Sequence, residues 1–231
     1  MLKALHKYTE EFLQLIYPSV CFACGQQLSR SESVICLQCD VALPQTNYWQ
    51  VRENKMERHL HGRFPFQSAV SLYYFTKDGG VQNLLHELKY RGRTEVGFFL
   101  GEKLGQKLAV SELEKPDVIV PLPLYWKKEK QRGYNQSSYF AEGLSSILKA
   151  SVDINSVERI VATDSQTRKN RFDRIENVEH VFRLHNNHQL ENKHVLLVDD
   201  VLTTGATIEA CANALLQAQN IKISIATIAV A

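Results

Sequence analysis

Residues 195–207, VLLVDDVLTTGAT, constrain the fold of this chain more than any other segment. The consecutive apolar residues at its start predict a central strand buried on both faces, as in a parallel sheet. Two adjacent acids, Asp199 and Asp200, follow where that strand emerges. Neighbouring carboxylates repel each other and are costly to bury, so they need a polyol, a cation or both. The alternative, a plain strand–turn–helix with solvated acids, does not explain the pair.

A short Thr/Gly loop follows the acids and opens a predicted helix. Its backbone N–H groups and hydroxyls lie at the positive end of that helix, which suits a phosphate. Gly205 lets the backbone approach such a ligand closely. The phosphate-binding candidates are Thr203, Thr204, Gly205, Ala206 and Thr207.

Strand and helix signals alternate over residues 67–231, which predicts an α/β fold with a mostly parallel sheet and a ligand site at the carboxyl ends of the strands. We expect strands at 67–75, 117–120, 157–161, 180–184, 194–200 and 221–230, and helices at 80–91, 94–109, 135–149 and 205–218.

Four of the five cysteines form two CxxC pairs within a short stretch, Cys21/Cys24 and Cys36/Cys39. Paired CxxC turns aim four thiolates at one point, so a structural zinc ion is favoured over disulfide or redox use. Cys211 stands alone in a predicted helix and is expected to be a core residue.

The chain divides into a front module at 1–45, a polar linker at 46–66 and the α/β domain at 67–231. The front module begins with an amphipathic helix at 2–16, expected to pack on the protein rather than on a membrane surface. His59 and His61 in the linker are expected to be surface residues, since the cysteines complete a metal shell. No apolar run reaches the length of a membrane span, the start is a poor signal peptide, and the expected location is the cytoplasm.

The segment VLLVDDVLTTGAT resembles the signature of type I phosphoribosyltransferases, which bind 5-phosphoribosyl-1-pyrophosphate (PRPP). The resemblance implies that Asp199 and Asp200 hold the ribose hydroxyls and act in catalysis. It implies that residues 203–207 hold the 5-phosphate, and that Mg²⁺ accompanies PRPP.

Further motifs narrow the resemblance. Three features precede the signature in this order: the four-cysteine module, LHELKYRG at 85–92 and VPLP…RGYNQ at 120–136. Together they resemble the ComF competence family. That family comprises phosphoribosyltransferase-like proteins linked to DNA uptake in natural transformation. The order and spacing match over about residues 15–231.

Pro121, Leu122 and Pro123 end a predicted strand, and the resemblance makes them the pyrophosphate loop of the fold. Basic groups follow this loop, and we expect Arg132 and Asn135 to contact the ligand. The lysines at 127, 128 and 130 are equally well explained as a solvated face. Residues 165–174 are basic and occupy the place of a mobile substrate loop in type I enzymes.

Aromatic residues beside cations predict a second kind of contact, with single-stranded DNA, in which bases stack on rings and cations take phosphates. A net charge of +2 requires any such contact to come from a local patch. The candidates are Lys89, Tyr90, Arg91, Trp126, Lys127, Lys128, Lys130, Arg168 and Arg171.

Three functions stay open on the sequence. The first is a DNA-uptake factor with a phosphoribosyl site. The second is an active transferase that joins PRPP to a small nitrogenous acceptor, although no base-binding hood is recognisable. The third is a regulator that has lost catalysis. A homodimer is expected only from the habit of the family.

Overall fold

The computed structural model describes residues 19–161, 181–185 and 187–231. The expected helix at 2–16 and the basic segment at 165–174, with Arg168 and Arg171, lie outside these ranges. In the part that is described, no helix is long and apolar enough to cross a membrane.

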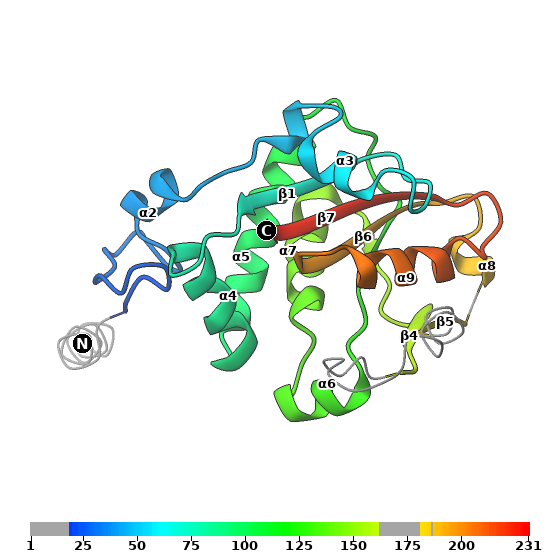
Figure 1. The fold of residues 1–231 in the computed structure, drawn as a ribbon. Helices are drawn as coiled ribbons and strands as arrows, with labels where there is room; N and C mark the ends of the chain where they lie inside the picture. Colours follow the sequence, from blue (N-terminus) through cyan, green and yellow to red (C-terminus); the bar gives the residue numbers. More distant parts are fainter. Residues whose placement is uncertain (1–18, 162–180, 186) are drawn as a thin grey trace, which may run out of the picture.

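A five-stranded sheet forms the centre of the molecule, in the order β1-β7-β6-β2-β3, with every neighbouring pair parallel (Figure 1). Strands β6 and β7 at its centre are almost wholly buried, as their apolar sequences predict. The strand bounds are β1 Ala69–Tyr74, β2 Val118–Pro121, β3 Ser151–Val152, β6 His194–Leu202 and β7 Lys222–Val230.

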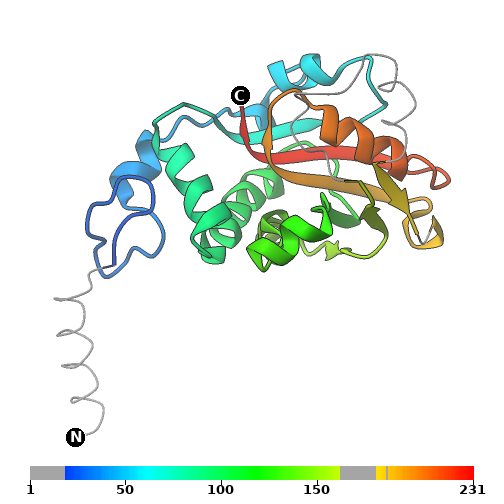
Figure 2. The same cartoon turned by 60° about the horizontal axis from the view of Figure 1, so that its bottom comes forward.

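Helices cover both faces of the sheet, which gives three layers (Figure 2). Helix α9 lies on one face, while α4, α5 and α7 lie on the other. Helices α5 and α7 approach each other at Gly101 and Gly143, where an added Cβ on Gly101 would lie 2.3 Å from the Phe140 carbonyl oxygen. The helix bounds are α4 Gly80–Tyr90, α5 Thr94–Ala109, α7 Gln136–Leu148 and α9 Ala206–Leu215.

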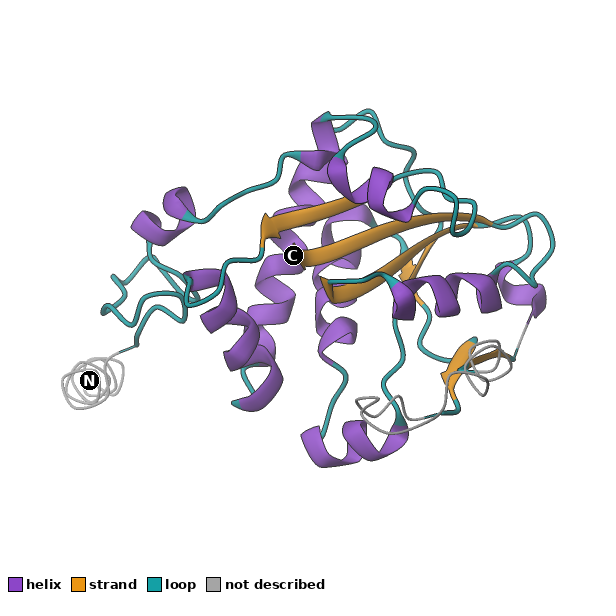
Figure 3. Ribbon diagram, viewed as in Figure 1, coloured by secondary structure: helices purple, strands orange, loops and turns teal. Residues whose placement is uncertain are grey.

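Short elements complete the α/β domain (Figure 3). Strands β4 (Val157–Arg159) and β5 (Phe182–Leu184) form a separate antiparallel pair, and α8 (Asn187–Leu190) precedes β6. Helix α6 (Trp126–Arg132) forms where the sequence suggested a basic loop. The residues KKEKQR are good helix formers, and Gly133, with φ 87°, ends the helix in the left-handed conformation.

Residues 46–66, expected as a linker, form ordered structure against the sheet. They contain the 3₁₀ helix η1 (Tyr48–Gln50) and helix α3 (Lys55–Leu60), and Trp49, Met56 and Leu60 are buried. Asn54 and Glu57 form a capping box, and Asn54 also donates to the Ala69 carbonyl at 2.9 Å. The polar residues that suggested a linker therefore cap a helix whose apolar side chains belong to the core.

Candidate functional site

The two acids lie at the carboxyl end of β6. Strand β2 ends at Pro121, opposite Val198, so β6 runs on past β2 while it stays paired with β7, and the acids lie just beyond the end of β2. Asp199 accepts hydrogen bonds from the Asp200 N–H at 2.8 Å and from the Ser137 hydroxyl at 3.2 Å. Asp200 is buried, with 5% of its surface exposed.

The environment of Asp199 disfavours its charge. Burial and then the neighbouring Asp200 carboxylate raise the pKa of Asp199 to about 7, although the Asp200 N–H, Lys89 and Ser137 act in the opposite direction. A carboxyl group that titrates near neutrality beside a second acid is typical of a ligand or catalytic site.

Asp200 has two polar partners, which come from the helices on the face of the sheet opposite α9. Lys89 Nζ lies 2.8 Å from Asp200 Oδ1, and the Gln136 amide donates to Asp200 Oδ2 at 2.6 Å. Gln136 in turn accepts a hydrogen bond from Arg132, and the Tyr134 hydroxyl donates to the Leu88 carbonyl. The motifs around LKYRG and RGYNQ therefore meet at the acid pair, which their separation in the sequence did not reveal.

The loop at 203–207, predicted to bind a phosphate, joins the end of β6 to the start of α9. Gly205 begins α9 in the left-handed conformation, with φ 78°, and Thr203 and Thr204 are exposed. Ala206 is also exposed, and Thr207 is half-buried. The first N–H of the ten-residue helix α9, that of Ala206, donates to the Thr204 hydroxyl at 3.5 Å. The N–H groups of such a first turn have no partner within their own helix and suit an anion.

Helix α3 and the residues after it hold this loop from the side. Arg63 donates from Nη1 to the Thr204 carbonyl at 2.6 Å and pairs with Glu209 at 3.5 Å. A ring nitrogen of His59 lies 3.1 Å from the same carbonyl. His59 is exposed, as the sequence predicted. Sequence reasoning missed Arg63, which falls in the apparent linker, and did not foresee that His59 would contact the loop.

The predicted pyrophosphate loop lies beside the acids. Leu122 N–H donates to the Val198 carbonyl at 2.8 Å, which places Pro121, Leu122 and Pro123 at the same sheet edge. Asn135 caps α7 through its oxygen and donates from Nδ2 to the Leu122 carbonyl at 3.1 Å. The Asn135 side chain thus holds the predicted pyrophosphate loop through the Leu122 carbonyl. Arg132 faces Gln136 and the Tyr90 ring, 5.7 Å from the ring centre.

A cavity of about 440 Å³ lies next to Lys89. It brings together three of the nucleic-acid candidates, Lys89, Tyr90 and Lys128, and adds Arg132 and Tyr134. Its lining, in the part of the chain that the structure describes, carries three cations, two tyrosines and no acid. We call it the cationic pocket.

The other candidates that are described lie outside this lining. Trp126 is 56% exposed, and Lys127 Nζ lies 5.4 Å from the centre of its ring. Arg91 and Lys130 are exposed. They lie on α6 and at the end of α4, the two elements that also supply the lining residues Lys128 and Lys89.

The four cysteines Cys21, Cys24, Cys36 and Cys39 converge on one point, with all sulfur atoms within 4.8 Å of one another. The Sγ atoms of Cys24 and Cys36 are 3.8 Å apart, and a tetrahedral zinc ion with Zn–S bonds of about 2.3 Å needs sulfurs about 3.8 Å apart. No disulfide joins them, and the Cys36 N–H points at the Cys21 sulfur at 3.3 Å. The cluster can therefore bind a metal ion.

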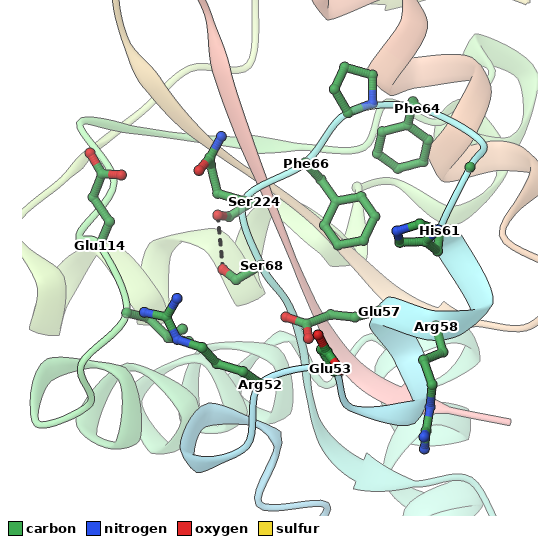
Figure 4. Close-up of a pocket in the computed structure, with 14 residues that line it drawn as sticks. Arg52, Glu53, Glu57, Arg58, His61, Phe64, Phe66, Ser68, Glu114 and Ser224 are labelled. Atoms are coloured by element: carbon green, nitrogen blue, oxygen red, sulfur yellow. Dashed lines mark hydrogen bonds between the residues drawn. The ribbon is translucent and has the colours of Figure 1, made fainter.

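A larger cavity, of about 900 Å³, lies at the opposite, amino-terminal edge of the sheet. Figure 4 shows Phe66, Glu57 and the hydrogen-bonded pair Ser68–Ser224 around it. It contains none of the residues that the sequence singled out for PRPP, metal or DNA. The converging acids, loop and cations therefore mark the sheet edge at 199–207 as the candidate site, despite the smaller cavity there.

Comparison with known proteins agrees with this architecture. A family model described as phosphoribosyl transferase domain matches residues 134–231. DNA utilization protein YhgH of Salmonella typhimurium is 30% identical over 215 residues, which cover 88% of this chain and 93% of that protein. Competence protein ComFC of Bacillus subtilis is 27% identical over 86% of this chain and 78% of its own length. Competence protein F of Haemophilus influenzae is 36% identical over 98 residues, which cover 42% of this chain and 43% of that protein. With a parallel sheet, an acid pair at its edge and a cysteine cluster in front, the chain belongs to the ComF family of phosphoribosyltransferase-like proteins.

Proposed function

We propose that this protein acts in DNA utilisation or competence by binding PRPP at the acid pair and single-stranded DNA at the neighbouring cationic pocket. The relatives YhgH and ComFC carry names from these processes. The observation that carries the proposal is the position of Lys89, which contacts Asp200 and also lines the pocket.

In this proposal the ribose hydroxyls bind Asp199 and Asp200, and the 5-phosphate binds the loop at 203–207. The exposed hydroxyls of Thr203 and Thr204 and the start of α9 supply its donors. The pyrophosphate lies near residues 121–123. Mg²⁺, as an oxygen-seeking cation, fits the carboxylates of the acid pair and would neutralise ligand charge there.

The strand-binding part rests on the composition of the cationic pocket. Lys128 and Arg132 offer phosphate contacts, while Tyr90 is exposed and offers a ring to a base. The cysteine cluster holds a structural zinc ion in this proposal, because its sulfur spacing fits a closed four-thiolate shell.

Calorimetric titration tests the two ligands separately. We expect wild-type protein to bind PRPP with Mg²⁺, and the double variant Asp199→Asn/Asp200→Asn to lose this binding while its circular dichroism stays native. PRPP binding by the double variant at wild-type affinity would show that the acids are not the site.

A second titration uses a short oligothymidylate. We expect its affinity to fall with salt by about 0.7 log units per log unit of salt for each phosphate contacted. If the protein binds PRPP but no oligothymidylate near physiological salt, the strand-binding part is wrong and the alternative function is favoured: an active phosphoribosyltransferase for a small nitrogenous acceptor.

A further inference from the structure

Lys89 lies between two sites and can serve only one of them fully. Its ammonium group is 2.8 Å from Asp200 Oδ1, and 24% of its side chain is exposed. The same side chain lines the cationic pocket. In the protein without ligand, Asp200 therefore largely neutralises the charge of Lys89. Only Lys128 and Arg132 then offer a full positive charge to a phosphate in the pocket.

Occupation of the acid pair changes this balance. Asp200 now accepts from Lys89 at one oxygen and from Gln136 at the other. Ribose hydroxyls that donate to this carboxylate compete with Lys89 for the same lone pairs. The Gln136 amide is anchored on its far side by Arg132, so Lys89, at the end of a flexible stem, is the donor that can move.

We propose that Lys89 is a shared cation: a phosphoribosyl ligand at the acid pair releases the Lys89 ammonium to the cationic pocket, which tightens the binding of single-stranded DNA. The proposal rests on the proposed function and adds regulation to it. Because coupling between two binding sites is reciprocal, the strand also tightens the binding of PRPP.

The pocket itself favours this direction. The charged residues that line it are Lys89, Lys128 and Arg132, and no acid among the described lining residues competes for the released ammonium. Arg132 stays fixed between Gln136 and the Tyr90 ring. A phosphate of the strand is then the available counter-charge for Lys89.

The test measures oligothymidylate affinity with and without saturating Mg²⁺ and PRPP, across a range of salt concentrations. In wild-type protein we expect PRPP to raise the affinity about fivefold or more, the lower end of typical site-to-site coupling. The salt slope should steepen by about 0.7, as for one additional phosphate contact.

Two lysine variants make a matched pair. Both Lys89→Gln and Lys128→Gln remove one charge from the pocket lining, but only Lys89 contacts Asp200. Lys89→Gln should abolish the effect of PRPP on strand affinity. Lys128→Gln should lower strand affinity in both states and keep the ratio between them. Asp200→Asn, which frees Lys89 permanently, should raise strand affinity without any PRPP.

Three results would overturn the proposal. A strand displaced by PRPP would show that both ligands compete for the pocket. Both ligands binding with a ratio of one would remove the coupling and leave the proposed function intact. Absence of strand binding altogether would remove both the coupling and the strand-binding part of the proposed function.

Discussion

At the scale of single residues, the two adjacent acids have opposite roles in stability. Asp199 is a half-buried carboxyl whose pKa is raised to about 7 by desolvation and by Asp200, so its charge destabilises the folded protein. Asp200 is the counter-charge of Lys89. The two adjacent acids are thus unequal, because Asp200 forms an ion pair with Lys89, whereas for Asp199 the effect of Lys89 is outweighed by desolvation and by the Asp200 charge.

The pH dependence of Asp199 has a definite sign. An aspartate in an unfolded chain has a pKa of about 3.9, so between that value and about 7 the folded protein binds the extra proton. Folding stability from this group therefore decreases as the pH rises through this window, and it stays lower above pH 7.

Asp199→Asn should therefore raise the melting temperature, by about 2–4 °C at pH 8 for a gain of roughly 1 kcal/mol, and by less at pH 5. Asp200→Asn should lower the melting temperature, because it leaves the half-buried Lys89 ammonium without its partner. Differential scanning calorimetry of both variants measures this. Equal shifts of the same sign would contradict the assignment.

At the scale of elements, α3 and its following turn act on the phosphate loop. The Arg63 guanidinium fixes the Thr204 carbonyl and Glu209, so it orients both the loop and the first turn of α9. Loss of this contact should free the loop at 203–207, which in the proposed function has to be pre-organised for a phosphate.

Arg63→Ala should weaken the binding of ribose 5-phosphate about five- to tenfold, which corresponds to the loss of about 1 kcal/mol from one exposed hydrogen bond. Arg58→Ala is the matched control, because Arg58 lies on α3, is exposed and, within the described residues, has no hydrogen bond or ion pair with the loop. Isothermal titration should show no change for the control. An equal loss in both variants would assign the effect to α3 as a whole.

Local patterns predicted most elements, and distance along the chain explains what they missed. The helix at 94–109 was predicted with its observed bounds. Strands β6 and β7 were recognisable because a continuous apolar run indicates a buried strand from the local sequence alone. The hydrogen bond from Arg63 to Thr204 spans 141 residues, so no local pattern contains it. The pairing of Lys89 with Asp200 escaped prediction for the same reason.

At the scale of the whole molecule, α4 joins the cysteine cluster to the candidate site. Asn83 on α4 donates to the Ala23 carbonyl at 2.8 Å, and Ala23 lies between two metal-ligand candidates. Lys89, less than two turns further along the same helix, contacts Asp200. Arg93, just after α4, lies 5.5 Å from the centre of the Phe22 ring.

Removal of the metal ion should therefore weaken ligand binding at the acid pair. We expect one zinc ion per chain by elemental analysis of protein purified under reducing conditions. Chelation should lower the melting temperature by several degrees and weaken PRPP binding, and added zinc should restore both. Protein that lacks zinc under these conditions, or whose PRPP affinity ignores chelation, would contradict this coupling.

The pairing of β1 with β7 has a consequence for how the chain folds. Ser68, directly before β1, is hydrogen-bonded to Ser224, 156 residues away, and β7 separates β1 from the rest of the described sheet. Two segments so far apart in the sequence lose chain entropy when they come together, before their contacts stabilise the pair. Such sheets therefore assemble slowly. Until β7 is in place, β1 presents an apolar, unpaired edge. Aggregation during refolding is thus expected to depend more on protein concentration and on the time that β7 takes to dock than on the stability of the finished fold.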